Sequence, residues 1–268
     1  MKAYRLGDCG YDVGLLQRCL MGSGYQLELT SVYDDATAAT VKAVQAKVGL
    51  VVDGIAGPKT LAAIANGRRD PKHLRDADIE MAAERLAVPI ACVRAVNEVE
   101  STGSGFLFDG RPKILFERHI FWQRLDSRGI PPAPIAATNP NICSQMRGGY
   151  RGGAAEYERL ADAALVDARA AYESASWGAF QVMGYHWKRL GYSGIGAFVA
   201  RMERSEADQF DAFVRFVAAD ASLLAALKVG NWAAFAKGYN GSNFTRNLYD
   251  AKLTLAYRRY AGERVLSR

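Results

Sequence analysis

Residues 89–100 read PIACVRAVNEVE, a proline followed by apolar residues at helical spacing. Pro89 suits the first turn of a helix, and Val93 and Val96 mark one apolar face. Glu100 comes seven residues after Val93 and four after Val96, so the pattern places a carboxylate on that same face. The run STGSG at 101–105 then ends the helix. We therefore expect a helix with its inner face in the core and an acidic side chain at its carboxyl end.

The position of Glu100 predicts unusual acidity. Burial disfavours an ionised carboxylate, and so does the negative end of the helix dipole, so both effects would raise its pKa. A carboxylic acid that stays protonated near neutral pH is what a glycosidase uses to protonate the leaving oxygen. The alternative for this helix alone is a frayed last turn that leaves Glu100 in water. Glu98 lies four residues after Arg94 on the polar face, and we expect these two to pair.

A second carboxylate follows in the next segment, FLFDGRPKILFE at residues 106–117. Apolar runs on both sides of Asp109-Gly110 indicate a hairpin with a two-residue turn. In that register Phe108 faces Arg111, and Glu117 lies opposite Thr102, close to Glu100. Asp109 would lie at the tip, about 23 Å away along a straight ribbon. Glu117 is therefore the first choice for a second catalytic carboxylate, and Asp109, the expected turn former, is the second.

Helical patterns dominate the rest of the chain from about residue 75. One long interruption, residues 127–153, contains four prolines and ends in the glycine-rich GGYRGG. A loop of this length inside a folded domain is usually functional or mobile. The expected helices lie near residues 76–86, 89–100, 118–126, 154–173, 206–219, 231–238 and 244–260.

The first 66 residues form a separate pattern of three short helices. The segments YDDATAATV at 33–41 and DGIAGPKTL at 53–61 are weak copies of each other, each a turn followed by a helix start. A polar stretch with Gly67 and Pro71 follows. The sequence thus predicts a domain at 1–66, a linker at 67–74 and a larger domain at 75–268.

Composition narrows the function classes. The net charge of +6 falls entirely after residue 66, because residues 1–66 hold six basic and six acidic side chains. That asymmetry suits a polyanionic target such as a cell envelope, although a solvated basic surface fits almost as well. The N-terminus has no apolar signal region and no apolar run spans a membrane, so a protein that stays in the cytoplasm until released is expected.

Metal chemistry has little support in the pattern. The three histidines are far apart and form no zinc-binding spacing, so neither a metal nor another cofactor is expected. The cysteines show no C-x-x-C spacing, and we expect four free, buried thiols. A nucleic-acid partner is not expected, because no stripe of basic and aromatic residues is present.

The ordered motifs resemble known families. The first segment, with VGLLQRCL at 13–20 and DGIAGPKT at 53–60, resembles peptidoglycan-binding domains of wall hydrolases. Glu100-Ser101, GAFQ at 178–181 and GYNG at 238–241 resemble the lysozyme-like superfamily. The string GRPKILFERH at 110–119 looks like the N-acetylmuramidase domain of modular phage endolysins, over about residues 75–265.

The resemblance implies a mainly α fold: a three-helix peptidoglycan-binding domain, then a lysozyme-like α+β domain with one hairpin. It implies a monomeric muramidase in which Glu100 is the general acid and Gln181, Tyr239 and Asn240 hold the glycan. The missing signal peptide and the leading binding domain are typical of a phage lysin for a Gram-negative host. Two alternatives remain at this stage, a lytic transglycosylase and an inactive wall-binding protein.

Overall fold

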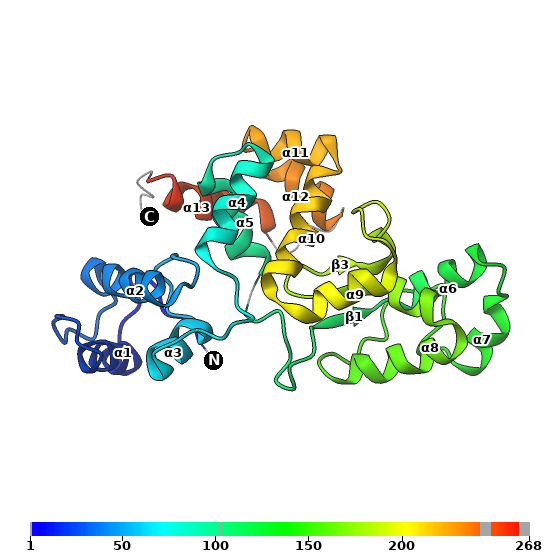
Figure 1. Cartoon of the computed structure of the whole chain (residues 1–268), viewed down its shortest axis with the longest axis horizontal. Coiled ribbons are helices and arrows are strands. Elements are labelled where there is room, and N and C mark those ends of the chain that lie inside the picture. Colours follow the sequence, from blue (N-terminus) through cyan, green and yellow to red (C-terminus); the bar gives the residue numbers. More distant parts are fainter. Residues whose placement is uncertain (1, 102, 242–247, 263–268) are drawn as a thin grey trace. The chain divides into compact units, whose positions relative to one another are not determined.

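The computed structural model describes residues 2–101, 103–241 and 248–262 of the chain (Figure 1). It is mainly helical with one small sheet, which confirms the expected fold class. Its contacts divide the chain into two compact units, one of residues 1–104 with 226–268 and the other of residues 105–225.

The first three helices form the small bundle expected at the N-terminus. Asp34 caps the second helix by accepting a 2.8 Å hydrogen bond from the amide of Thr37. Gly49 ends that helix with a φ of 75°, a conformation that glycine adopts without strain. The helices are α1 (Tyr11–Gly22), α2 (Asp35–Val48) and α3 (Pro58–Asn66). Their side chains enclose a core of Val13, Leu16, Leu20, Tyr33, Val41, Val44 and Ala56.

A buried glutamine explains why the DGIAGP motif follows α2. The Gln45 amide oxygen accepts hydrogen bonds from the backbone N–H groups of Asp53 and Gly54 at 3.1 and 2.9 Å. Its amide nitrogen donates to the Asp53 carboxylate at 2.7 Å and to the Ile55 carbonyl at 3.1 Å. One fully buried polar group therefore fixes the turn that starts α3.

The rest of the first unit is built around α5 (Ile90–Glu100), which begins after Pro89 as predicted. Its neighbours include α4 (Asp76–Leu86), α12 (Trp232–Asn240) and α13 (Tyr249–Tyr260). The inner face of α5 is buried through Ala91, Cys92, Val93, Ala95 and Val96.

The expected pair of Arg94 with Glu98 is wrong. Arg94 binds Asp76 at 2.9 Å, and Glu98 accepts from Arg259 at 2.5 Å and from Tyr260 at 2.9 Å. Helical spacing brings Arg94 and Glu98 near each other, but the neighbouring helices offer each a partner that the sequence pattern does not reveal.

The second unit combines six helical segments with the sheet. Its helices are α6 (Arg118–Ser127), α7 (Pro132–Thr138), α8 (Ala155–Glu173), the 3₁₀ turn η1 (Gly184–His186), α9 (Ile195–Arg204) and α10 (Glu206–Ala218). The short helix α11 (Ala221–Lys228) leads back to the first unit. Helices α7, α9 and α11 are absent from the sequence-based prediction.

The sheet has the order β1–β2–β3, and all its pairs are antiparallel. Strand β1 (Ile114–Phe116) pairs with β2 (Ala175–Trp177), with Ile114 opposite Trp177 and Phe116 opposite Ala175. Strand β3 (Val182–Met183) pairs with the other edge of β2. A segment about 60 residues away in the chain therefore forms the partner of the strand that leads to Glu117.

Two fully buried charges sit beneath the sheet on α8. Arg159 binds Glu156 at 2.7 Å, and both side chains have 0% exposure. Glu156 also accepts from the amides of Phe116, Arg151 and Gly152 at 3.0, 2.6 and 2.9 Å. Burial opposes ionisation, but these donors and Arg159 hold the pKa of Glu156 below its usual value.

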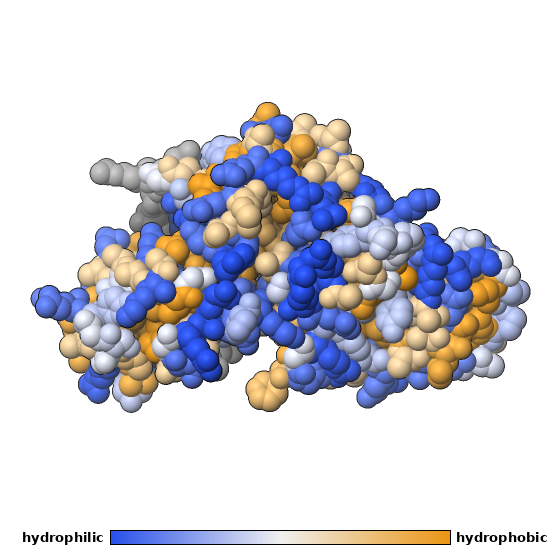
Figure 2. Space-filling model, in the orientation of Figure 1, coloured by the Kyte–Doolittle hydropathy of each residue, from blue (hydrophilic) through white to orange (hydrophobic). Residues whose placement is uncertain are grey.

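The cysteines are free, as expected, but only two of the four are buried. Cys92 and Cys143 lie in the core, whereas Cys9 and Cys19 are exposed on the first bundle, which corrects the prediction that all four are buried. In the described part of the chain no helix is both long and apolar enough to cross a bilayer. Figure 2 accordingly shows apolar side chains scattered among polar ones.

Candidate active site

Glu100 is the last residue of α5, and the helix is intact up to it. The amide of Ser101 continues the helical pattern by donating to the Asn97 carbonyl at 3.0 Å, and the Ser101 hydroxyl donates to the same oxygen at 2.5 Å. Both bonds oppose fraying of the last turn. Glu100 is partly buried at this end of the helix.

Two tyrosines from other helices lie within electrostatic reach of Glu100. Burial raises the pKa of Tyr239 on α12 well above its usual value, and the negative charge of Glu100 raises it further. The pKa of Tyr249 on α13 is raised by the same two causes in the same order. Both phenols therefore remain protonated and uncharged beside the carboxyl group. Three elements of the first unit thus converge at Glu100, and Tyr239 is among the residues expected there.

Asn240 is the last residue of α12, and its side chain lies outside the described part of the structure. Tyr249 is a neighbour of Glu100 that sequence reasoning did not single out. The sequence marks Tyr249 only as an aromatic residue near the start of the last expected helix, and this pattern does not predict a contact with Glu100.

Glu117 lies in the second unit, between β1 and α6, with 17% of its side chain exposed. The Tyr150 hydroxyl lies 2.9 Å from each carboxylate oxygen and donates to Glu117. Nδ1 of His119 is 3.2 Å from Oε2 of Glu117, so the imidazole ring lies against this carboxylate. Burial, opposed by Glu117 and aided by Arg147, lowers the pKa of His119, which favours a neutral ring.

Tyr150 is the main residue that the sequence analysis missed. Burial and its hydrogen bond to Glu117 raise the pKa of Tyr150 to about 12, so its hydroxyl remains a donor over the working range of an enzyme. A signal was present, because this tyrosine is the one aromatic residue in GGYRGG. Its contact with Glu117 spans 33 residues and is not visible in any local pattern.

The loop that carries Tyr150 is held at both ends. Arg118 donates to the carbonyl oxygens of Met146, Pro140 and Arg147 at 2.9, 3.1 and 3.0 Å. Gly149 packs against that guanidinium: a Cβ there would lie 3.2 Å from Nη1 of Arg118. Farther on, the loop is fixed by its amide bonds to Glu156. The interruption expected as a loop at 127–153 is thus an anchored segment that includes α7.

The hairpin at Asp109 has a different register from the predicted one. Phe106 bridges Pro112, and the amide of Leu107 donates to the Arg111 carbonyl at 2.7 Å, so Phe108, Asp109 and Gly110 together form the turn. The predicted two-residue turn is therefore wrong by one residue, as a bulge or a longer loop would make it.

The pairing that placed Glu117 opposite Thr102 is also wrong. The amide of Glu117 donates to the Ser174 carbonyl at 2.9 Å, because β1 continues along β2 and not along the segment after Glu100. Thr102 itself lies outside the described residues.

Asp109 behaves as an exposed turn residue. Its carboxylate binds Arg111 at 2.6 Å and its side chain is 43% exposed. The hydrogen bond from Arg111 holds the pKa of Asp109 below its usual value. These contacts match the turn-forming role that made Asp109 the second choice.

Gln181 is held on the same face of the sheet as Glu117. Its side-chain oxygen accepts from Ser176 at 2.7 Å, and its amide donates to the Gly178 carbonyl at 2.8 Å. Ser176 faces Leu115 across the sheet, and Leu115 precedes Glu117 by two residues, which is the spacing of side chains on one face. Gln181 is exposed and directly precedes β3, and its backbone has a φ of 49°, in the left-handed region.

The predicted residues therefore form two groups. Glu100 and Tyr239 lie together in the first unit, and Glu117 and Gln181 share a sheet face in the second. A carboxyl group among neutral phenols and a carboxylate held by a phenol donor are suited to acid catalysis and to charge stabilisation, respectively. In the described ranges, no cluster of three or more His, Cys, Asp or Glu side chains could hold a metal ion.

Together with the mainly α fold, these groups define a glycoside hydrolase of the lysozyme type. The model of the N-acetylmuramidase family matches residues 89–261, and a model of a peptidoglycan binding domain matches residues 9–64. The chain belongs to the N-acetylmuramidase family, and peptidoglycan is its substrate.

A solved structure agrees with this assignment. The crystal structure of the Burkholderia AP3 phage endolysin is 54% identical, with a TM-score of 0.93, and the match covers 97% of this chain and 100% of that one. No curated protein matches the chain.

Proposed function

We propose that the chain is an endolysin that hydrolyses the β-1,4 bond between N-acetylmuramic acid and N-acetylglucosamine. Glu100 donates its proton to the glycosidic oxygen while the bond from C1 to that oxygen breaks. Water then adds at C1, and the proton that it releases restores the carboxyl group of Glu100. The observation that carries the proposal is the placement of Glu100 at an intact helix end beside two phenols that stay neutral.

Glu117 orients the water or stabilises the positive charge that develops on the sugar ring. Its support is the Tyr150 donor, which fixes the carboxylate while leaving part of it exposed. Gln181, Tyr239 and Asn240 hold the glycan. Residues 1–66 bind the wall, residues 67–74 link the domains, and residues 75–268 carry the chemistry.

The biological setting is part of the same proposal. The endolysin of the similar structure belongs to a phage, and we infer that this chain is a phage protein as well. It acts as a monomer that accumulates in the host cytoplasm and reaches the wall once the membrane opens. Neither membrane insertion nor nucleic-acid binding is part of this function.

The test is a mass spectrum of digested peptidoglycan, run with Glu100→Gln and with Glu158→Gln as a control. Glu158 is an exposed carboxylate on α8 whose partner, Arg151, is also exposed. Hydrolysis gives reducing products with one added water per cut, and Glu100→Gln should lower the rate by about 10²-fold or more. Anhydro products lighter by one water, or a Glu100→Gln protein as active as the control, would overturn the proposal.

A further inference from the structure

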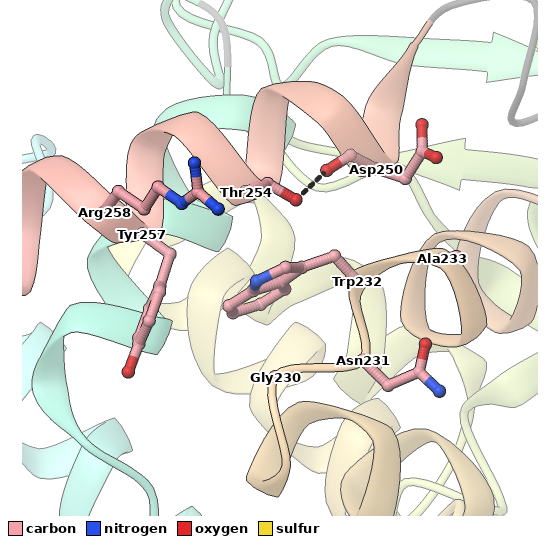
Figure 3. Close-up of a pocket in the computed structure, with 8 residues that line it drawn as sticks. All are labelled: Gly230, Asn231, Trp232, Ala233, Asp250, Thr254, Tyr257 and Arg258. Carbon is pink, nitrogen blue, oxygen red and sulfur yellow. Dashed lines mark hydrogen bonds between the residues drawn. The ribbon is translucent and has the colours of Figure 1, made fainter. Parts of the chain in front are cut away.

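A groove with a volume of about 430 Å³ lies in the first unit, between the start of α12 and the outer face of α13 (Figure 3). The indole of Trp232 extends from α12 toward α13, where its ring centre lies 5.3 Å from that of Tyr257. Asp250, Thr254 and Arg258 complete the α13 side. The groove therefore combines an aromatic floor with groups of both charges.

The α13 residues of the groove form one stripe. Asp250, Thr254, Tyr257 and Arg258 follow the spacing of a single helix face. A rise of 1.5 Å per residue separates the backbones of Asp250 and Arg258 by about 12 Å along the axis. The negative group thus lies at one end of the stripe and the exposed Arg258 at the other.

The groove is built on the same two helices that bring phenols to Glu100. Asp250 directly follows Tyr249, one of the two phenols within reach of the Glu100 charge. Helix α12 also runs from the groove, at Trp232, to Tyr239, the other phenol. A substrate group attached to a sugar at Glu100 would reach the Asp250 end first and the Arg258 end last.

We infer that this groove binds the stem peptide that hangs from the muramic acid of peptidoglycan, an inference that rests on the proposed function. The N-terminus of that peptide is joined to the sugar, so the ammonium is on the side chain of the third residue and the terminal carboxylate is on the fourth. Fully extended, these two groups lie up to about 10 Å apart, a separation that the side chains of Asp250 and Arg258 can match from backbones about 12 Å apart. Such a peptide carries one ammonium group and several carboxylates, including its C-terminus. Its ammonium pairs with Asp250, its terminal carboxylate with Arg258, and its methyl groups pack on Trp232 and Tyr257.

The kinetic test compares two soluble substrates, glycan tetrasaccharides that bear tetrapeptides and the same glycans after the peptides have been removed. The measured quantity is the ratio of kcat/KM on the first to kcat/KM on the second. In Arg258→Gln this ratio should fall by about threefold to tenfold, the range from an exposed ion pair to a charge-assisted hydrogen bond. The control Lys228→Gln removes an exposed charge at the end of α11, outside the groove, and should keep the parent ratio.

Direct binding separates this inference from the proposed function. The tetrapeptide N-acetyl-L-alanyl-γ-D-glutamyl-diaminopimelyl-D-alanine, whose acetyl group replaces the amide link to the sugar, is titrated into the full chain while the indole N–H resonance of Trp232 is followed by NMR. We expect a saturable shift that weakens in both Asp250→Asn and Arg258→Gln. An unchanged kinetic ratio in Arg258→Gln, or the absence of a shift in the parent protein, overturns the inference. Failure of both glycans to be cleaved, with the shift present, would instead count against the proposed function alone.

Discussion

Tyr150→Phe isolates the contribution of one hydroxyl to the second carboxylate. The substitution removes the donor that lies 2.9 Å from both oxygens of Glu117 and keeps the ring that packs in the loop. A hydrogen bond to a charged group contributes about 1.5–3 kcal/mol. Because Tyr150 is 45% exposed, water can replace part of this bond, and the lower end of the range applies. At 1.36 kcal/mol per factor of ten, we expect a loss of about tenfold.

The assay must distinguish positioning from folding. If Tyr150 orients Glu117 for the transition state, kcat on soluble glycan falls and KM changes little. Tyr11→Phe, in which a 77% exposed tyrosine on α1 loses its hydroxyl, serves as the control. Circular dichroism establishes that both variants are folded. A Tyr150→Phe enzyme within twofold of the parent in kcat, or one in which only KM rises, would refute the positioning role.

Three further results are expected. In a turbidity assay, Glu117→Gln should lower the rate of lysis by about 10²-fold. Asp109→Asn keeps a turn-forming residue at an exposed site, so its rate of lysis should stay within about twofold of the parent. The reverse order would exchange the roles of the two carboxylates. Burial and two arginines lower the pKa of His186 to about 4 and keep its ring neutral. The free energy of unfolding should therefore be at its full value above pH 6.5, and it should fall by at most about 3 kcal/mol as the pH drops toward 4. Denaturant titrations of His186→Gln should show a weaker fall over this interval, and an identical slope would argue against it. Residues 1–66 alone should sediment with purified peptidoglycan, and residues 67–268 should lose activity on insoluble wall relative to the full chain; equal activity would show that the binding domain contributes no tethering.

Short-range sequence patterns were enough to predict α5, which presents Glu100, and the turn that starts α3. The proline at residue 89, the apolar spacing that follows and the polar glycine-containing stop define α5 almost to the residue. The turn motif before α3 was also readable, because Gln45 and the glycines act within a few residues of one another. Short helices such as α7 and α9 were missed, since seven to ten residues give little periodicity to detect.

Contacts between distant segments could not be read in this way. The partner of β1 lies about 60 residues farther along the chain, and a hairpin rule can only propose the nearest strand. Glu98 was assigned to Arg94 by helical spacing, but Arg259, 161 residues away, takes that position. Tyr150 was missed for the same reason. The position of Glu100 was predictable because it follows from the spacing of a single helix. The hydrogen-bond partner of Glu117 was not predictable, because it comes from a loop 33 residues away.

Three adjacent residues after β1 serve three different parts of the second unit. Glu117 receives the Tyr150 hydroxyl, Arg118 grips the backbone that leads to Tyr150, and His119 lies against the Glu117 carboxylate. A single inserted or deleted residue between Ile114 and His119 would therefore break all of them at once. We therefore expect an insertion or deletion in this string to be tolerated far less than one of the same size in the loop around α7. Residues 114–119 thus behave as one structural unit whose length, and not only whose composition, is fixed by its contacts.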